Sequence, residues 1–242
     1  MTGADKLKLA YYRSFQGVFN VGERFMAWRK PELTTGPGSI AAIPSLLAAE
    51  GVHRPLLVTG PNIVKTIGRR IMSILDAEGY DYAVFSEVEA NPSVATAERC
   101  YALYKERLCD GFIALGGGSP MDTAKAAAAR AARPDRSLAE MAGVLRVGRP
   151  TPPLIAVPTT SGTGSEATVA AVITDRETNH KYAVMDLHLI PRRAVLDPEL
   201  TVGMPPRTTA TTGMDALTHA IEGYITTVSY THLRAHETAA NL

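Results

Sequence analysis

Residues 111–125 have the sequence GFIALGGGSPMDTAK, in which a short apolar run leads into three glycines. An apolar run of this length is typical of a buried strand, which we expect from Gly111 to Leu115. The glycines permit a tight turn, and Ser119 and Pro120 suit the N-cap and first turn of a helix. The stretch therefore predicts a strand, a glycine turn and a helix.

The same alternation extends along the chain on both sides of this turn. Apolar runs and helical spacings predict strands at 55–59, 82–85, 154–157, 169–174 and 194–196, and helices at 63–78 and 93–108. Strands that alternate with helices imply a parallel sheet with right-handed crossovers. The predicted fold class is therefore α/β, with the sheet domain over residues 31–205.

The segments that flank this domain differ from it. Aromatic and basic residues at helical spacing predict a helical arm over residues 1–30, for packing or oligomer contacts. After two prolines, a helix predicted from Thr208 to Tyr224 begins an all-helical domain, which we assign to residues 206–227. Residues 228–242, VSYTHLRAHETAANL, resemble translated vector sequence. We expect a non-native tail on a truncated chain.

The composition excludes several kinds of partner. The 25 basic and 24 acidic side chains give a net charge of +1, so no strong field attracts nucleic acid or a membrane surface. Cys100 and Cys109 are too few for a disulfide framework, and the first residues lack the apolar core of a signal peptide. We expect a cytoplasmic protein with a small-molecule partner.

The glycine turn is a candidate phosphate site. Ligands of parallel sheets bind beyond the carboxyl ends of the strands, where a helix N-terminus favours an anion such as a dinucleotide pyrophosphate. Asp122 could either cap backbone donors or touch the ligand. Glycine runs also form plain turns, and the usual GxGxxG fingerprint of dinucleotide folds is absent.

A second loop strengthens this prediction. Residues 158–166, PTTSGTGSE, follow a predicted strand and offer hydroxyls and amides, which suit phosphate, ribose and carboxamide groups. Lys181 adds a cation that could reach a phosphate or remain a solvated surface charge. The motif GxxxxGK[ST] is absent, which argues against a P-loop ATPase.

Asp215 and His219 form a candidate metal half-site. They are four residues apart on a predicted helix, so they share one face and could bind Fe²⁺ or Zn²⁺ together. The alternative is an Asp–His hydrogen bond between neighbouring helical turns. Two ligands do not complete a catalytic site, and the sequence assigns no catalytic residue.

Four motifs resemble those of the iron-containing (group III) alcohol dehydrogenases: GGGSPMDTAK at 116–125, PTTSGTGSEAT at 158–168, LDPELT at 196–201 and GMDALTHAIEGY at 213–224. The resemblance covers residues 30 to 227. It implies an α/β domain that binds NAD or NADP, a helical domain, and a metal and a substrate between them. The implied reaction is metal-dependent hydride transfer between an alcohol or aldehyde and nicotinamide.

The resemblance also implies roles for individual residues. Asp215 and His219 match the first two metal ligands of the family, and its two further histidine ligands have no counterpart here. The residues that match cofactor-binding positions are Gly116, Gly117, Gly118 and Ser119 at the pyrophosphate, with Asp122 nearby, then Thr159, Thr160, Thr168 and Lys181, and also Asn91.

Gly60 departs from many NAD-preferring relatives, which have an aspartate there that repels a 2′-phosphate. We therefore expect the site to tolerate NADP. The resemblance leaves the substrate open and implies a homo-oligomeric parent. Alternative interpretations are a dehydroquinate synthase-like lyase, a glycerol-phosphate dehydrogenase and a non-catalytic nucleotide-binding fragment. We expect the fragment to bind nucleotide weakly and to turn over little.

Overall fold

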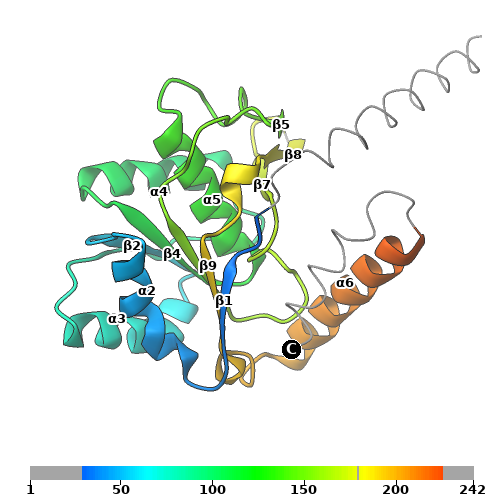
Figure 1. The fold of residues 1–242 in the computed structure, drawn as a ribbon. Helices are drawn as coiled ribbons and strands as arrows, with labels where there is room; N and C mark the ends of the chain where they lie inside the picture. The colour runs from blue at the N-terminus through cyan, green and yellow to red at the C-terminus, as the bar shows by residue number, and fades with distance from the viewer. Residues whose placement is uncertain (1–28, 179, 226–242) are drawn as a thin grey trace, which may run out of the picture.

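The computed structural model describes residues 29–178 and 180–225, and a six-stranded parallel sheet forms its centre (Figure 1). The sheet order is β1-β9-β6-β4-β2-β3. The strands are β1 (Glu32–Thr35), β2 (Pro55–Val58), β3 (Ala83–Phe85), β4 (Gly111–Gly116), β6 (Leu154–Pro158) and β9 (Arg193–Leu196). The predicted parallel α/β fold is confirmed. The predicted tail and nearly all of the predicted N-terminal arm lie outside the described residues.

Two pairs of helices cover the two faces of this sheet. The longer helices are α2 (Ile43–Ala49), α3 (Ile67–Ala77), α4 (Val94–Glu106) and α5 (Gly118–Ala132). Alternate strand residues face opposite layers: Phe112 packs with α4 and α5, whereas Ile113 packs with α2 and α3. This alternation is the two-residue period of a strand buried on both faces. It explains why the central strands are continuously apolar.

A second, three-stranded sheet covers the outer side of α5. Its strands are β5 (Gly143–Val144), β7 (Ala170–Asp175) and β8 (His180–Met185), and β7 pairs antiparallel with β8. Ala126 and Ala129 of α5 pack against residues of this sheet, while Ala124 and Ala127 face the large sheet. Because α5 is enclosed between two sheets, the run Ala126 to Ala129 is buried and consists of small side chains.

Several predicted boundaries need correction. The helix expected at 63–78 divides into the 3-10 turn η2 (Ile63–Lys65) and α3, because Thr66 leaves the helical conformation with φ −120° and ψ −93°. β1, α2, β5 and β8 were not predicted, since β1 is a mostly exposed edge strand and the others are short or mixed in polarity. The remaining 3-10 helices are η1 (Ser39–Ala42), η3 (Leu187–Leu189) and η4 (Pro198–Leu200).

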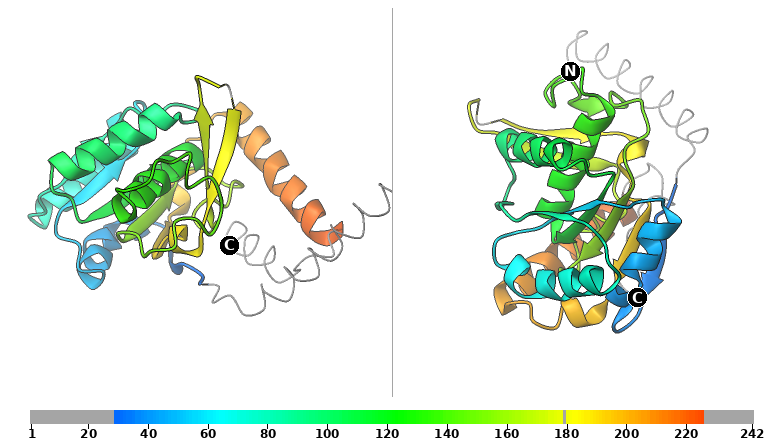
Figure 2. Two further views of the ribbon diagram at one scale, coloured as in Figure 1. Left: turned by 90° about the horizontal axis from the view of Figure 1, so that it is seen from above. Right: turned by 90° about the vertical axis from the view of Figure 1, so that its left-hand side faces the viewer.

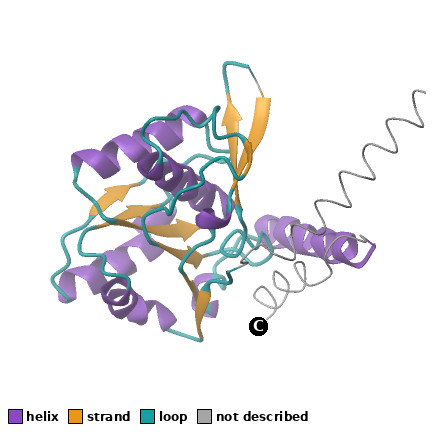
Figure 3. Cartoon of the chain, turned by 45° about the horizontal axis from the view of Figure 1, so that its top comes forward, coloured by secondary structure: helices purple, strands orange, loops and turns teal. Residues whose placement is uncertain are grey.

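The last helix, α6 (Pro206–Ile225), projects away from the sheet domain (Figures 2 and 3). It encloses the predicted helix at 208–224. Leu217 is 50% exposed and Tyr224 is 76% exposed. The apolar side chains of α6 are therefore largely uncovered by the described residues. Within that part of the chain, no helix is long and apolar enough to cross a membrane.

Candidate nucleotide-binding site and metal half-site

The strand order reverses beside the glycine turn. From β2 the chain passes to β3 on one side and then returns through α4 to β4 on the other side. Ligands of open parallel sheets bind at such a reversal, outside the carboxyl ends of the two strands. Here these ends lead into Thr59 and Gly60 after β2 and into the glycine turn after β4.

The glycine turn leaves β4 abruptly. Gly116 has φ 141°, a conformation that L side chains rarely adopt, and a Cβ there would lie 2.7 Å from Pro120 Cγ. Gly117 has the extended backbone of an N-cap and α5 begins at Gly118, so the N-cap predicted at Ser119 is wrong. The chain turns into the helix directly after Gly116, which places Ser119 within the first turn of α5. Within residues 29–178 and 180–225, no side chain caps this helix N-terminus.

The second loop packs directly on this turn. Thr159 N–H donates to Gly116 O at 3.0 Å, which joins the ends of neighbouring β4 and β6. A Cβ on Gly117 would lie 3.1 Å from Thr160 Oγ1, and a Cβ on Gly118 would lie 3.2 Å from Ser165 Oγ. Gly117 and Gly118 therefore permit close approach of the two loops. The structure brings together the glycines and the two threonines that the sequence proposed as one site.

The hydroxyls of this second loop suit a polar ligand. Thr160 Oγ1 and Thr163 Oγ1 are both shielded from solvent and have no hydrogen-bond partner among the described residues. A buried hydroxyl without a partner carries a free-energy cost that a bound phosphate or carboxamide could remove. Together with the open N-terminus of α5, this donor set fits a dinucleotide.

Asp122 faces the second sheet and does not cap the helix. Its carboxylate accepts a hydrogen bond from the backbone N–H of Val172. Burial raises the pKa of Asp122 to about 6, and the nearby ammonium groups of Lys125 and Lys181 partly oppose this rise. The capping role is therefore wrong, because the carboxylate is engaged with β7.

The side chain of Thr168, a predicted cofactor contact, is hydrogen-bonded to another residue of the protein. Its hydroxyl accepts a hydrogen bond from Lys125 Nζ at 2.7 Å. Lys125 is fully buried, and burial lowers its pKa to about 8 while Asp122 and Glu166 oppose this shift. Lys125 was missed as a site residue. The only signal available in the sequence was its place at the end of the GGGSPMDTAK motif.

Asn91 and Lys181 form an exposed pair near Asp122. Lys181 Nζ on β8 donates to Asn91 Oδ1 at 2.7 Å, and Asn91 has a positive φ of 53°. Lys181 also interacts electrostatically with Asp122. The structure therefore joins two predicted cofactor residues from distant parts of the sequence, and their contact with a cofactor stays a prediction.

The metal half-site lies on α6, which is distant in sequence from the glycine turn. Asp215 Oδ1 and His219 Nε2 are 3.9 Å apart, and both side chains are more than 40% exposed. This separation is too long for the alternative Asp–His hydrogen bond. Among the described residues, no group of three His, Cys, Asp or Glu side chains could hold a metal ion. The two donors alone do not fit a catalytic metal site.

The sequence of the sheet domain matches the model of a known protein family. The model of the family described as iron-containing alcohol dehydrogenase matches residues 31–198. The match includes both loops and ends before α6, which carries Asp215 and His219.

Individual relatives show the same similarity. Lactaldehyde reductase of Escherichia coli is 36% identical over 79% of this chain and 50% of that protein, and choline dehydrogenase of Bacillus subtilis is 42% identical over 78% and 48%. The crystal structure of sulfoacetaldehyde reductase from Bifidobacterium kashiwanohense in complex with NAD⁺ superposes with a TM-score of 0.72. It has 35% identity and covers 82% of this chain and 54% of that chain. The chain spans about half the length of the curated relatives it matches.

Proposed function

Because the chain belongs to the iron-containing alcohol dehydrogenase family, we propose that its sheet domain supplies the nucleotide-binding half of an NAD(P)-dependent alcohol dehydrogenase. The enzyme would transfer a hydride between a small alcohol or aldehyde and nicotinamide, and would assemble as a homo-oligomer. The observation that carries the proposal is the glycine turn at the strand reversal, packed against the threonine loop. The crystal structure of sulfoacetaldehyde reductase with NAD⁺ supports it.

The residues of the two loops would bind and orient the dinucleotide. Backbone N–H groups at the start of α5 favour the pyrophosphate, because the helix dipole places positive charge there. The hydroxyls of Thr160 and Thr163 can donate to phosphate, ribose or carboxamide oxygens. When bound, nicotinamide supplies the hydride acceptor or donor. The role of the protein is to hold the ring in one orientation and to exclude water.

We further propose that this site accepts NADP as well as NAD. Gly60 follows β2 at the strand reversal and has no carboxylate to repel a 2′-phosphate. A Cβ on Gly60 would make only an ordinary 3.5 Å contact with Val88 O. Gly60→Asp should therefore fold and should discriminate against NADP by at least about tenfold, whereas the unchanged chain should not. Strong rejection of NADP by the unchanged chain would contradict this proposal.

Asp215 and His219 would provide two of the metal ligands of the whole enzyme. The present chain should bind Fe²⁺ or Zn²⁺ with low affinity, because a catalytic site needs about three protein ligands. His219→Ala should abolish even this weak binding in a calorimetric titration. Tight binding that survives the substitution would place the metal elsewhere.

The first test of the proposal is a thermal-shift titration with NAD and NADP. A ligand that binds only the folded state raises stability as its concentration passes the dissociation constant. Gly117→Ala should weaken the shift, because its Cβ would push against Thr160. Gly203→Ala is the matched control, since a Cβ at Gly203 meets nothing within 4 Å. A cooperative unfolding transition whose melting temperature does not change with either nucleotide would contradict nucleotide binding.

The described residues by themselves are better suited to binding than to turnover. The exposed two-ligand arrangement on α6 supports this distinction. Nucleotide-dependent stabilisation without alcohol-dependent reduction of NAD or NADP is the expected result for this chain. The lyase alternative needs a separate test on a full-length enzyme that contains this sequence. Alcohol-dependent formation of NADH or NADPH by that enzyme would exclude it.

A further inference from the structure

A buried ammonium group connects α5 to the loop that follows β6. Lys125 Nζ donates to Ser165 O at 2.7 Å, to Thr168 O at 2.8 Å and Oγ1 at 2.7 Å, and to Ala170 O at 3.1 Å. An ammonium group has three protons, so these oxygens satisfy it completely. Burial of a charge is costly without such partners. The contacts therefore define the positions of four oxygens across the 165–170 segment.

The charges around Lys125 complete this arrangement. Asp122 lies one helical turn before Lys125 on α5, and the buried carboxyl of Glu166 belongs to the loop itself. Both carboxylates interact electrostatically with the ammonium group. Burial raises the pKa of Glu166, and Lys125 opposes that rise. The loop is thus held by an ionic cluster in addition to its hydrogen bonds.

The same loop contacts both candidate functional elements. On one side, Thr160 lies against Gly117 of the glycine turn. On the other side, Gly162 lies so close to α6 that a Cβ there would be 2.1 Å from Thr212 O. Thr212 precedes Asp215 by three residues, which is nearly one helical turn. A displacement of the loop would therefore reach both the nucleotide site and the metal helix.

We propose that Lys125 is a positioning residue: by holding the 165–170 segment, its ammonium group sets the spacing between the glycine turn and helix α6. Lys125 is fully buried and its ammonium group is engaged by loop oxygens, so it would act on the nucleotide through the loop. Its effect on nucleotide affinity rests on the proposed function, whereas its effect on the order of the loop can be measured without any ligand.

The experiment combines amide hydrogen exchange of the ligand-free chain with calorimetric titration of NAD. Lys125→Met keeps the length of the side chain and removes the ammonium group. Exchange should rise by about tenfold or more in residues 159–170 and in α6, since the combined loss of several hydrogen bonds to a charged group shifts the opening equilibrium by at least this factor. Exchange in β2 and β4 should stay unchanged, and NAD affinity should fall by a similar factor.

Two variants at Thr168 test the same contact with a smaller change to the buried cluster. Thr168→Val removes the hydroxyl that accepts from Lys125 and keeps the backbone carbonyls, so loop exchange should rise by about threefold to tenfold. Thr168→Ser keeps the hydroxyl and should restore the exchange rate and the NAD affinity. This pair decides the proposal even if Lys125→Met does not fold.

Unchanged loop exchange in a folded Thr168→Val variant would overturn the proposal. A uniform rise in exchange throughout the domain would also overturn it, because that pattern indicates general destabilisation. If the unchanged chain fails to bind NAD, the proposed function fails, and selective exchange in the loop and α6 still supports the positioning role.

Discussion

Helices α5 and α6 carry the two halves of the candidate site, and their surroundings are opposite. Met121, Ala124 and Ala127 of α5 are fully buried, whereas Met214, Leu217 and Tyr224 of α6 are 50–76% exposed. Both helices contain enough apolar residues to pack. Only α5 has its packing partners among the described residues, namely the large sheet and the small sheet.

This contrast distinguishes the two candidate sites physically. The glycine turn begins a helix whose position is fixed by burial on both sides, so its backbone donors are preorganised. The metal half-site lies on a helix whose position depends on few contacts, one of them between Gly162 and Thr212. Among the described residues, the packing that positions the candidate nucleotide-binding turn is therefore present, whereas a full set of candidate metal ligands is not.

A matched pair of methionine substitutions tests this contrast and has the largest expected effect. Met121→Ala should lower the free energy of unfolding by about 2–5 kcal/mol, because it leaves a cavity beneath α5. Met214→Ala on exposed α6 should change it by less than about 0.5 kcal/mol. Chemical denaturation of both variants measures the difference, and equal effects would show that α6 is packed in solution.

Gly162→Ala should release α6 from the loop. The added Cβ would meet Thr212 O, and Gly162 has φ 133°, so the change should cost about 1–3 kcal/mol locally. Amide exchange should rise in α6 while β4 remains protected. Loss of protection in β4 as well would show that the two helices are coupled more strongly than their burial indicates.

The buried carboxyl of Asp122 on α5 predicts a pH dependence of stability. Burial raises its pKa to about 6, so the folded protein holds this proton between about pH 4 and 6 while the unfolded chain releases it. The Asp122 contribution to stability is therefore present at low pH and is lost as pH rises through 6. Asp122→Asn should gain about 1–2 kcal/mol relative to the unchanged protein between pH 4.5 and 7. Parallel pH profiles of the melting temperature would contradict this prediction.

Gly213→Ala is the smallest change and should stabilise α6. A Cβ at Gly213 meets nothing within 4 Å, and alanine favours a helix by about 0.5–1 kcal/mol over glycine. Exchange in α6 should slow slightly, with no change in the melting temperature of the sheet domain. An unaltered exchange rate in α6 would indicate that this turn is already fixed by packing.

The residues that could be predicted from the sequence are those whose pattern is local. The apolar run at 111–115, the glycine turn and the helix that encloses Thr208 to Tyr224 follow from periodicity and turn chemistry. The resemblance in the motifs then brought the glycines and Thr160 into one expected site, and the geometry places them in contact. Ligand contacts by these residues stay predictions.

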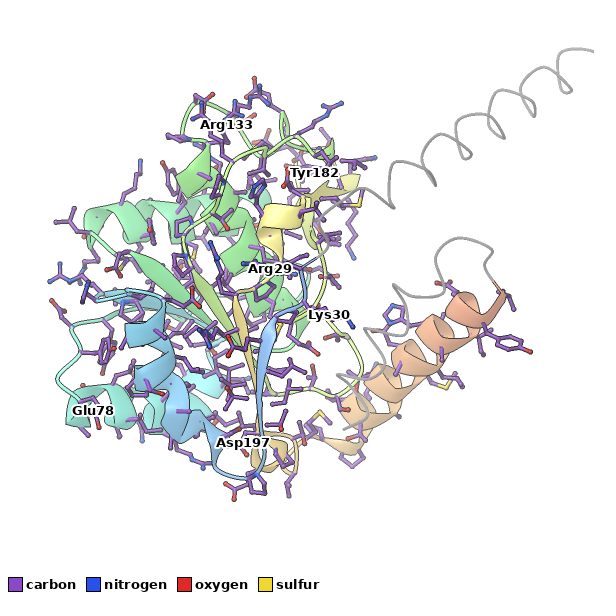
Figure 4. The ribbon with its side chains drawn as sticks, viewed as in Figure 1. Arg29, Lys30, Glu78, Arg133, Tyr182 and Asp197 are labelled. Carbon is purple, nitrogen blue, oxygen red and sulfur yellow. The ribbon has the colours of Figure 1, made fainter. Side chains whose placement is uncertain are left out.

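The features that could not be predicted depend on tertiary contacts. Lys125 follows a polar motif and precedes four alanines, and nothing local shows that a second sheet will bury its ammonium group. β8 begins with exposed polar residues, so its pairing with β7 is visible only in three dimensions. Ser119 was a reasonable cap by residue type, but the positive φ of Gly116 starts the helix earlier. Asp197, labelled in Figure 4, is buried and caps η4. The Asp–Pro pair in LDPELT is typical of an N-cap and first helical residue, but its burial depends on tertiary contacts.

The enclosure of α5 has a further consequence for the history of this sequence. Ala126 to Ala129 are limited by volume, because the two sheets leave no room for a longer side chain. Mutational drift at these positions should thus be restricted to the smallest residues, although none of them takes part in chemistry. Across related genes, this alanine run should look as invariant as the glycine turn beside it. Saturation mutagenesis would separate the two constraints. Substitutions of Ala126 to Ala129 should prevent folding, whereas substitutions in the glycine turn should reduce ligand binding.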